Sequence, residues 1–202
     1  MEKSCRLSVP DQRLIAALYA ERVLHETRLD TDLSSTLIVT DFASQRPKIS
    51  LDVVTQPAQI ITTPSGGCAL HDISSDVHHE ERRSILLTQI RKAVLEKPID
   101  QIALVASAPS LMPHRSLVDT IDQLRSAEEY VHQRFGKKRL VSNFICVKFP
   151  DGRTYPMQVN TPEFHAWYDR YEQEVLGRDD DAFGDNDYPI KVAPSYLHLV
   201  PS

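Results

Sequence analysis

Residues 101–106 read Gln-Ile-Ala-Leu-Val-Ala, an almost unbroken apolar run. A strand of this composition is expected to be buried on both faces, because neither face carries a row of polar side chains. Apolar residues at helical spacing precede it over residues 77–97 and follow it over residues 116–135. The three segments together predict an α/β unit in which a buried strand lies between two helices.

The ends of these two helices are marked by residues with known capping preferences. Pro98 stops the first helix, because a proline disfavours helical backbone in the residue before it. Ser116 and Asp119 have the spacing of a capping box at the start of the second helix, and Gly136 is a typical C-terminal cap.

The N-terminal third predicts one helix followed by strands. The helix opens at Ser8, with a proline near its first turn. Three short segments then have strand character: residues 36–39, 49–53 and 59–62. Because the turns between them are short, this part of the chain predicts an antiparallel meander.

The C-terminal third predicts a hairpin, a helix with an aromatic face, an acidic loop and a last strand. These elements cover, in order, residues 140–149 and 154–159, a helix from Thr161, the loop near 178–187, and residues 188–192. The whole chain is therefore expected to form a single α+β domain over residues 1–202. Its sheet should be mixed and mainly antiparallel, and about four helices should pack against it.

Composition limits the classes of function. Hydrophobic residues make up 41% and charged residues 25% of the 202 residues, which excludes a largely disordered chain. The net charge of −5 argues against a protein whose main task is binding nucleic acid, since such proteins usually carry a basic surface. A local basic run remains at Lys137, Lys138 and Arg139, where three charges at a helix-to-strand junction more often solvate a turn.

The cellular context is read from the cysteines and the apolar runs. Cysteines occur at positions 5, 68 and 146, an odd and widely spaced set that suits reduced thiols better than disulfides. No apolar segment follows Met1 as in a secretory signal, and no run is long enough to cross a bilayer. We expect a soluble, cytoplasmic protein without a membrane partner.

The segment Cys68–Glu81 concentrates most of the reactive side chains. Asp72, Asp76, His78 and His79 are the candidate ligands of a divalent metal. Familiar metal signatures place histidines four apart on a helix or at alternate positions of a strand. This segment has neither arrangement, so its spacing matches no metal signature. The alternative is a polar loop that leads into an exposed helix start, with Asp76 as the cap.

Cys68 and His71 are the candidate catalytic residues. Cys68 follows two glycines in a strand-to-helix connection, and His71 is close enough in sequence to take a proton from a thiol. Against this hypothesis, the sequence lacks a nucleophile elbow, and cysteine is commonly a small buried residue.

Three further segments have some features of a binding site. The acidic loop fails as an EF-hand, because Phe183 and Ile190 fall at ligand positions. Residues 107–114 follow a buried strand, the usual place of ligand loops, but lack glycines. The aromatic face of the last helix has the spacing of core packing.

Two classes of function follow. We expect a non-catalytic protein-interaction or assembly module, a subunit of a larger intracellular complex with a protein partner. The alternative is a small metal-assisted or cysteine-dependent hydrolase that uses Cys68–Glu81. The sequence identifies neither the partner nor the oligomeric state.

Overall fold

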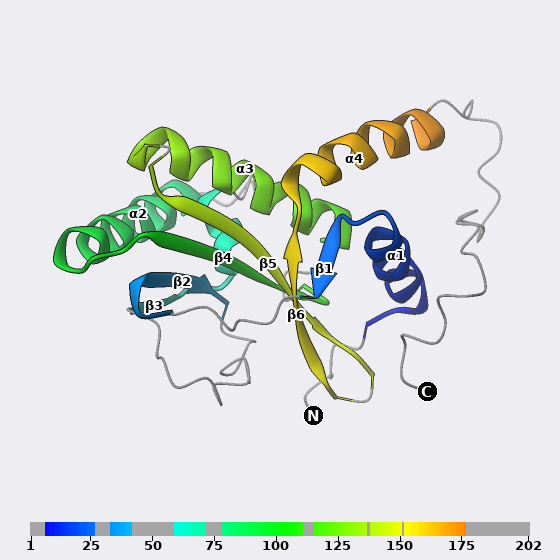
Figure 1. The fold of residues 1–202 in the computed structure, drawn as a ribbon, viewed down its shortest axis with the longest axis horizontal. Coiled ribbons are helices and arrows are strands. Elements are labelled where there is room, and N and C mark those ends of the chain that lie inside the picture. The colour runs from blue at the N-terminus through cyan, green and yellow to red at the C-terminus, as the bar shows by residue number, and fades with distance from the viewer. Residues whose placement is uncertain are drawn as a thin grey trace. The chain divides into compact units, whose positions relative to one another are not determined.

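The computed structural model describes residues 7–26, 33–41, 59–71, 78–110, 115–136, 138–150 and 152–176. These residues form four α-helices and six strands in an α+β fold (Figure 1). They belong to two compact units. The sheet unit contains Met1–Leu7 and Glu26–Val159, and the helical unit contains Ser8–His25 and Asn160–Ser202. The single-domain expectation stays a prediction.

The sheet unit is built on a mixed sheet, as expected. Its strands are β2 (Thr36–Thr40), β3 (Gln59–Thr62), β4 (Gln101–Ala108), β5 (Leu140–Lys148) and β6 (Thr154–Val159), in the order β6-β5-β4-β2-β3. β2 runs parallel to both β3 and β4, and β4 runs parallel to β5. Only the predicted β5–β6 hairpin pairs antiparallel among these strands. The expected predominance of antiparallel pairing is therefore wrong, although the mixed sheet is confirmed.

Burial and chain connection explain the parallel pairing. All five residues of β2 are buried, which is typical of an interior parallel strand. Residues 41–58 separate β2 from β3, and this is long enough for the crossover that parallel neighbours need. The strand expected at 49–53, on which the meander depended, lies outside the described residues.

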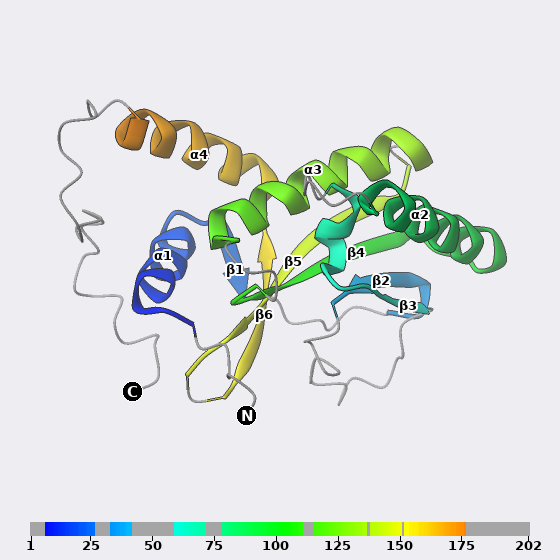
Figure 2. The same ribbon diagram turned by 180° about the vertical axis from the view of Figure 1, so that it is seen from behind.

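Two helices and one short turn pack on the same face of this sheet (Figures 1 and 2). They are α2 (His79–Glu96), α3 (Leu117–Phe135) and the 3₁₀ turn η2 (Gly66–Leu70). Leu104 of β4 meets η2, and its register partner Asn143 of β5 donates to Glu128 of α3 at 2.6 Å. Register partners share a face of the sheet, so η2 and α3 cover one side.

The helix boundaries follow the capping signals of the sequence. The Ser116 hydroxyl accepts from the Asp119 N–H, and the Asp119 carboxylate accepts from the Ser116 N–H, each at 3.0 Å. This confirms the capping box of α3. α2 begins after His78, whose side chain makes no capping bond, and Asp76 lies outside the described residues.

The opposite face of the sheet carries a second buried cluster, made of Ile38, Ala103, Val105, Phe144 and Cys146. Because Ile102 and Leu104 are also buried, on the face toward the helices, β4 is buried on both faces as its sequence predicts. Cys146, 3% exposed, is confirmed as a core residue.

The helical unit contains α1 (Val9–Ala20) and α4 (Thr161–Leu176), and β1 (Leu24–Glu26) lies where the chain passes into the sheet unit. Ser8 caps α1 as predicted. Arg170 of α4 donates to Glu21, just after α1, at 3.1 Å. On α4, Phe164 is fully buried and its ring stacks on Trp167, which agrees with the core role expected for the aromatic stripe.

None of the helices in the described part is long and apolar enough to span a membrane. The acidic loop and the last strand expected after residue 177 lie outside the described residues.

Candidate functional site

The parallel part of the sheet contains a topological switch point between β2 and β4. From β2 the chain moves to β3 on one side, and then returns past β2 to form β4 on the other side. In open sheets of parallel strands, ligands usually bind beyond the carboxyl ends of the two strands that flank such a point. The residues to inspect are therefore those at the ends of β2 and β4.

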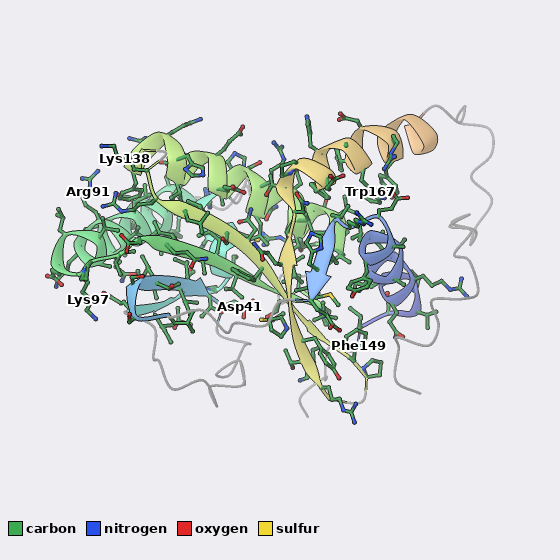
Figure 3. The ribbon with its side chains drawn as sticks, viewed as in Figure 1. Asp41, Arg91, Lys97, Lys138, Phe149 and Trp167 are labelled. Carbon is green, nitrogen blue, oxygen red and sulfur yellow. The ribbon has the colours of Figure 1, made fainter. Side chains whose placement is uncertain are left out.

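Asp41 and Ser107 occupy these two strand ends. The Asp41 carboxylate accepts from the Ser107 N–H at 2.9 Å and from the Ser107 hydroxyl at 3.0 Å. Asp41 is only 4% exposed, which is rare for an aspartate and requires such hydrogen bonds. Figure 3 shows Asp41 at this end of the sheet. The pair joins the residue after β2 to the last part of β4.

η2 closes the side of the switch point that faces the helices. Gly66 has φ +57°, and a Cβ placed on it would lie 2.1 Å from the Val105 carbonyl oxygen and 3.1 Å from the Asp41 nitrogen. A Cβ on Gly67 would lie 2.7 Å from the Leu104 Cβ. The Gly-Gly sequence is therefore required because the backbone of η2 lies directly on β4. No space for a ligand remains between them.

A small cavity of about 20 Å³ lies on the opposite face of the sheet. It has room for about one water molecule and not for a substrate. Its lining comes from β2, β4, β5 and their neighbours, and is mostly apolar: Leu33, Thr36, Ile38, Gln101, Ala103, Val105, Phe144, Cys146 and Pro156. The polar members lie at the amino end of the strands, where Gln101 donates to the Ser142 hydroxyl at 3.2 Å.

The Cys146 thiol faces this cavity in an environment that keeps it protonated. Burial, with a smaller contribution from the negative charge of Asp41, raises the pKa of Cys146 to about 12. Because the thiolate is the nucleophilic form, Cys146 is unreactive at neutral pH. The cavity and its thiol consequently have the features of a packed core. The Asp41–Ser107 pair is a buried, hydrogen-bonded polar contact within it.

The structure places the two predicted catalytic residues in different environments. Cys68 lies in η2, is fully buried, and its thiol donates to the Thr120 carbonyl at 3.6 Å. His71 is half-buried at the end of η2, and its Nδ1 atom makes no hydrogen bond. The thiol is therefore not accessible to a substrate in this conformation, and Nδ1 of His71 is not bonded to it.

The predicted metal ligands are only partly within the described residues. His78 is exposed and lies 3.6 Å from the Glu81 carboxylate, while His79 begins α2 beside it. Asp72 and Asp76 lie outside the described residues. Within the described part, no three His, Cys, Asp or Glu side chains are arranged to hold a metal ion. The four-residue metal set stays a prediction.

The sequence pointed to one half of the Asp41–Ser107 pair. Ser107 begins the ligand loop predicted over residues 107–114, although it lies within β4, and Asp41 is not among the predicted site residues. Its signal in the sequence is an acidic residue that follows the apolar run 36–39 after one threonine, whereas Ser107 follows 101–106 directly. Parallel pairing of these two strands would have brought both ends together.

Comparisons with known proteins leave the family open. No family model matches the sequence, and no curated protein matches it. Among solved structures, the chain is similar to carbonic anhydrase from Streptococcus mutans, with 14% identity over 76% of this chain and 99% of that chain, and a TM-score of 0.37. A likeness this weak supports no conclusion about fold or function.

Proposed function

We propose that this protein is a non-catalytic interaction module, and that the free edge of its sheet at β3 binds an extended strand of a partner protein. The observation that carries the proposal is that β3 ends the strand order of the described residues and pairs only with β2. An open strand edge offers main-chain donors and acceptors to another chain.

The hydrogen-bond pattern shows which residues face this edge. The Thr63 N–H donates to the Thr40 carbonyl at 2.9 Å. In a parallel ladder, alternate residues turn both backbone groups toward the same neighbour, so Ile61 also faces β2. The N–H and C=O groups of Ile60 and Thr62 therefore point away from β2, toward the edge.

The side chains of β3 also suit a partner strand. Ile60 is 53% exposed, and residues 59–62 include neither a charged residue nor a proline. Charged residues and prolines are the usual means by which proteins prevent pairing at an exposed edge. α2, which contacts β3, exposes Ile85 as a further apolar side chain.

The proposal extends to the partner class and the location expected from the sequence: a protein partner, within a larger cytoplasmic complex. The hydrolase alternative needs an accessible nucleophile or a metal. Its thiol candidate Cys68 would first have to leave the core. Its metal candidate rests on residues that include Asp72 and Asp76, and elemental analysis of the protein with and without His78→Ala would test it.

The decisive experiment compares two substitutions at the same edge position. Ile60→Pro removes the outward N–H without removing a bond to β2, whereas Ile60→Ala removes the side chain and keeps the N–H. The partner would be captured with a photoreactive amino acid in place of Thr62, purified, and titrated against each variant. We expect Ile60→Pro to weaken binding roughly tenfold or more, and Ile60→Ala by less.

The same photoreactive amino acid in place of Lys148, an exposed residue at the end of β5, is the control for non-specific capture. Equal affinities of the wild type and Ile60→Pro would refute strand addition at β3. Cross-linking no stronger at position 62 than at position 148 would count against the interaction function itself.

A further inference from the structure

We infer that the end of the sheet unit opposite Asp41 binds an acidic segment of a partner protein that also carries apolar side chains. This surface, the basic end, consists of Arg91, Leu95, Lys97, Lys138 and Leu140. Figure 3 shows Arg91, Lys97 and Lys138 at the end of the sheet unit where β4 and β5 begin. All five residues are exposed.

The charge at this end is opposite to that of the chain. Segments 91–100 and 134–140 contain seven basic residues and only two acidic ones, while the whole chain has a net charge of −5. A cationic region on an anionic protein attracts an acidic partner and excludes a basic one. Stabilisation of helix ends accounts for Arg134, which lies in the last turn of α3, and for Arg139, which donates to the Phe135 carbonyl. It does not account for Arg91, because the last turn of α2 contains no basic residue.

Two large apolar side chains lie among these cations. Leu95 is 80% exposed and Leu140 is 62% exposed, the highest values among the exposed large hydrophobic residues of the described part. Arg91 and Leu95 are four residues apart on α2 and therefore adjacent on its surface. Exposed leucines cost solvation free energy that a partner would recover by covering them.

Hydrogen bonds join the two segments into one preformed surface. The Arg139 guanidinium donates to the Ile99 carbonyl at 3.3 Å and to the Phe135 carbonyl at 3.4 Å. The Leu140 N–H donates to the Asp100 carbonyl at 3.0 Å. The end of α2 and the α3–β5 connection are thus held together before any partner binds, which lowers the entropic cost of association.

This combination favours a polypeptide over the two other polyanions that a basic surface attracts. Surfaces that bind single-stranded nucleic acid usually place exposed aromatic side chains among the cations, and the apolar members here are leucines. Insertion into a membrane normally uses a broad apolar face along a helix, whereas on α2 the exposed Leu95 is surrounded by charged residues. Acidic amphipathic segments present both carboxylates and apolar side chains.

The inference rests on the proposed function in that both require a protein partner. It uses a different surface from β3, so the two can fail separately: Ile60→Pro tests the strand edge, and substitutions at the basic end test the acidic partner.

The probe is a fluorescent helical peptide of glutamate and leucine, titrated against the full chain by anisotropy. We expect Arg91→Glu combined with Lys138→Glu to weaken binding roughly tenfold, and added salt to weaken binding to the wild type. Leu95→Ser combined with Leu140→Ser should also weaken binding roughly tenfold, through lost apolar contact. Circular dichroism would confirm that each variant is folded.

The matched controls are a charge reversal and an apolar-to-serine substitution at exposed positions outside the basic end. Lys148→Glu reverses an exposed charge at the other end of β5, and Val9→Ser removes an exposed apolar side chain from α1. Both should bind the peptide like the wild type. The inference would be overturned if Arg91→Glu combined with Lys138→Glu bound the glutamate–leucine peptide as tightly as the wild type does. Equal binding of a glutamate–serine peptide would also overturn it, as would tighter binding of anionic phospholipid vesicles or single-stranded DNA that depends on the same residues.

Discussion

The two ends of the same sheet differ in which side chains they expose to solvent. At the carboxyl end, Asp41 and Ser107 are joined by two hydrogen bonds, and Gly66 lies directly on the backbone of β4. At the amino end, Leu95 and Leu140 are among the most exposed apolar residues of the described part. Among the described residues, close contacts fill the end where α/β proteins usually bind ligands, and exposed apolar side chains lie at the other end.

This difference separates residues that stabilise the fold from residues available to a partner. Substitutions at the carboxyl end should lower the free energy of unfolding, because they disturb close contacts and buried hydrogen bonds. Substitutions at the amino end should leave stability unchanged. A large stability effect at the amino end, or none at the carboxyl end, would remove the contrast.

The largest effect is expected for Gly66→Ala. The new Cβ would meet the Val105 carbonyl oxygen at 2.1 Å, and the residue would keep an unfavourable positive φ. We expect a loss of roughly 4 kcal/mol or more in the free energy of unfolding, measured by urea denaturation. Gly152→Ala is the control, since Gly152 also has a positive φ but no atom within 4 Å of a Cβ. It should cost about 1 kcal/mol. Equal losses would show that the contact with β4 contributes nothing.

The next largest loss of stability is expected when the buried hydrogen bonds between Asp41 and Ser107 are removed. Asp41→Ala removes the acceptor of both the N–H and the hydroxyl of Ser107, and should cost about 3 kcal/mol. Ser107→Ala removes only the hydroxyl bond and should cost about 1.5 kcal/mol. Urea denaturation of both variants and the double variant measures the coupling between them. Additive losses would mean that the side chains do not interact.

The dependence of stability on alkaline pH tests whether the Cys146 thiol, on the cavity side of the sheet, is buried. Its pKa is raised from 9.0 to about 12 by burial and by Asp41, so the folded state holds the thiol proton more tightly than the unfolded state. This contribution to stability is complete below pH 9 and is lost between pH 9 and about 12, because only the unfolded thiol ionises in that range. We expect the free energy of unfolding to fall by up to about 1.4 kcal/mol per pH unit from this group.

Cys146→Ala provides the comparison for that experiment. The difference between the wild type and the variant should shrink as the pH rises from 8 toward 10, about one unit above the unfolded pKa of 9.0. A difference that stays constant over this range would show that the thiol is solvated in the folded protein.

The sequence predicted best where the signals are local. The capping box at Ser116 and Asp119, the stop before Pro98 and the hairpin of residues 140–149 and 154–159 depend on residues only a few positions apart, and the structure confirms all three. The burial of β4 on both faces was also predictable, because an apolar run has no row of polar side chains to turn toward solvent.

Strand pairing and the switch point could not be predicted in the same way. Asp41 and Ser107 are 66 residues apart and meet only because β2 and β4 pair in parallel. The short apolar runs near residues 36 and 59 are compatible with either direction of pairing. For Cys68, the glycines before it suggested an exposed turn, whereas they serve to bring η2 onto β4 and bury the thiol.

The smallest effect is expected at the amino end, and it tests whether the exposed residues are free for a partner. Leu140→Thr keeps a residue that favours strands while removing most of the exposed apolar surface at the start of β5. We expect the free energy of unfolding to change by no more than about 0.5 kcal/mol, as for surface substitutions in general. Val147→Thr, the matched change at a fully buried position of the same strand, should cost about 2 kcal/mol because it buries a hydroxyl. If both variants lose the same stability, Leu140 contributes to the core, and its exposure gives no reason to place a partner there.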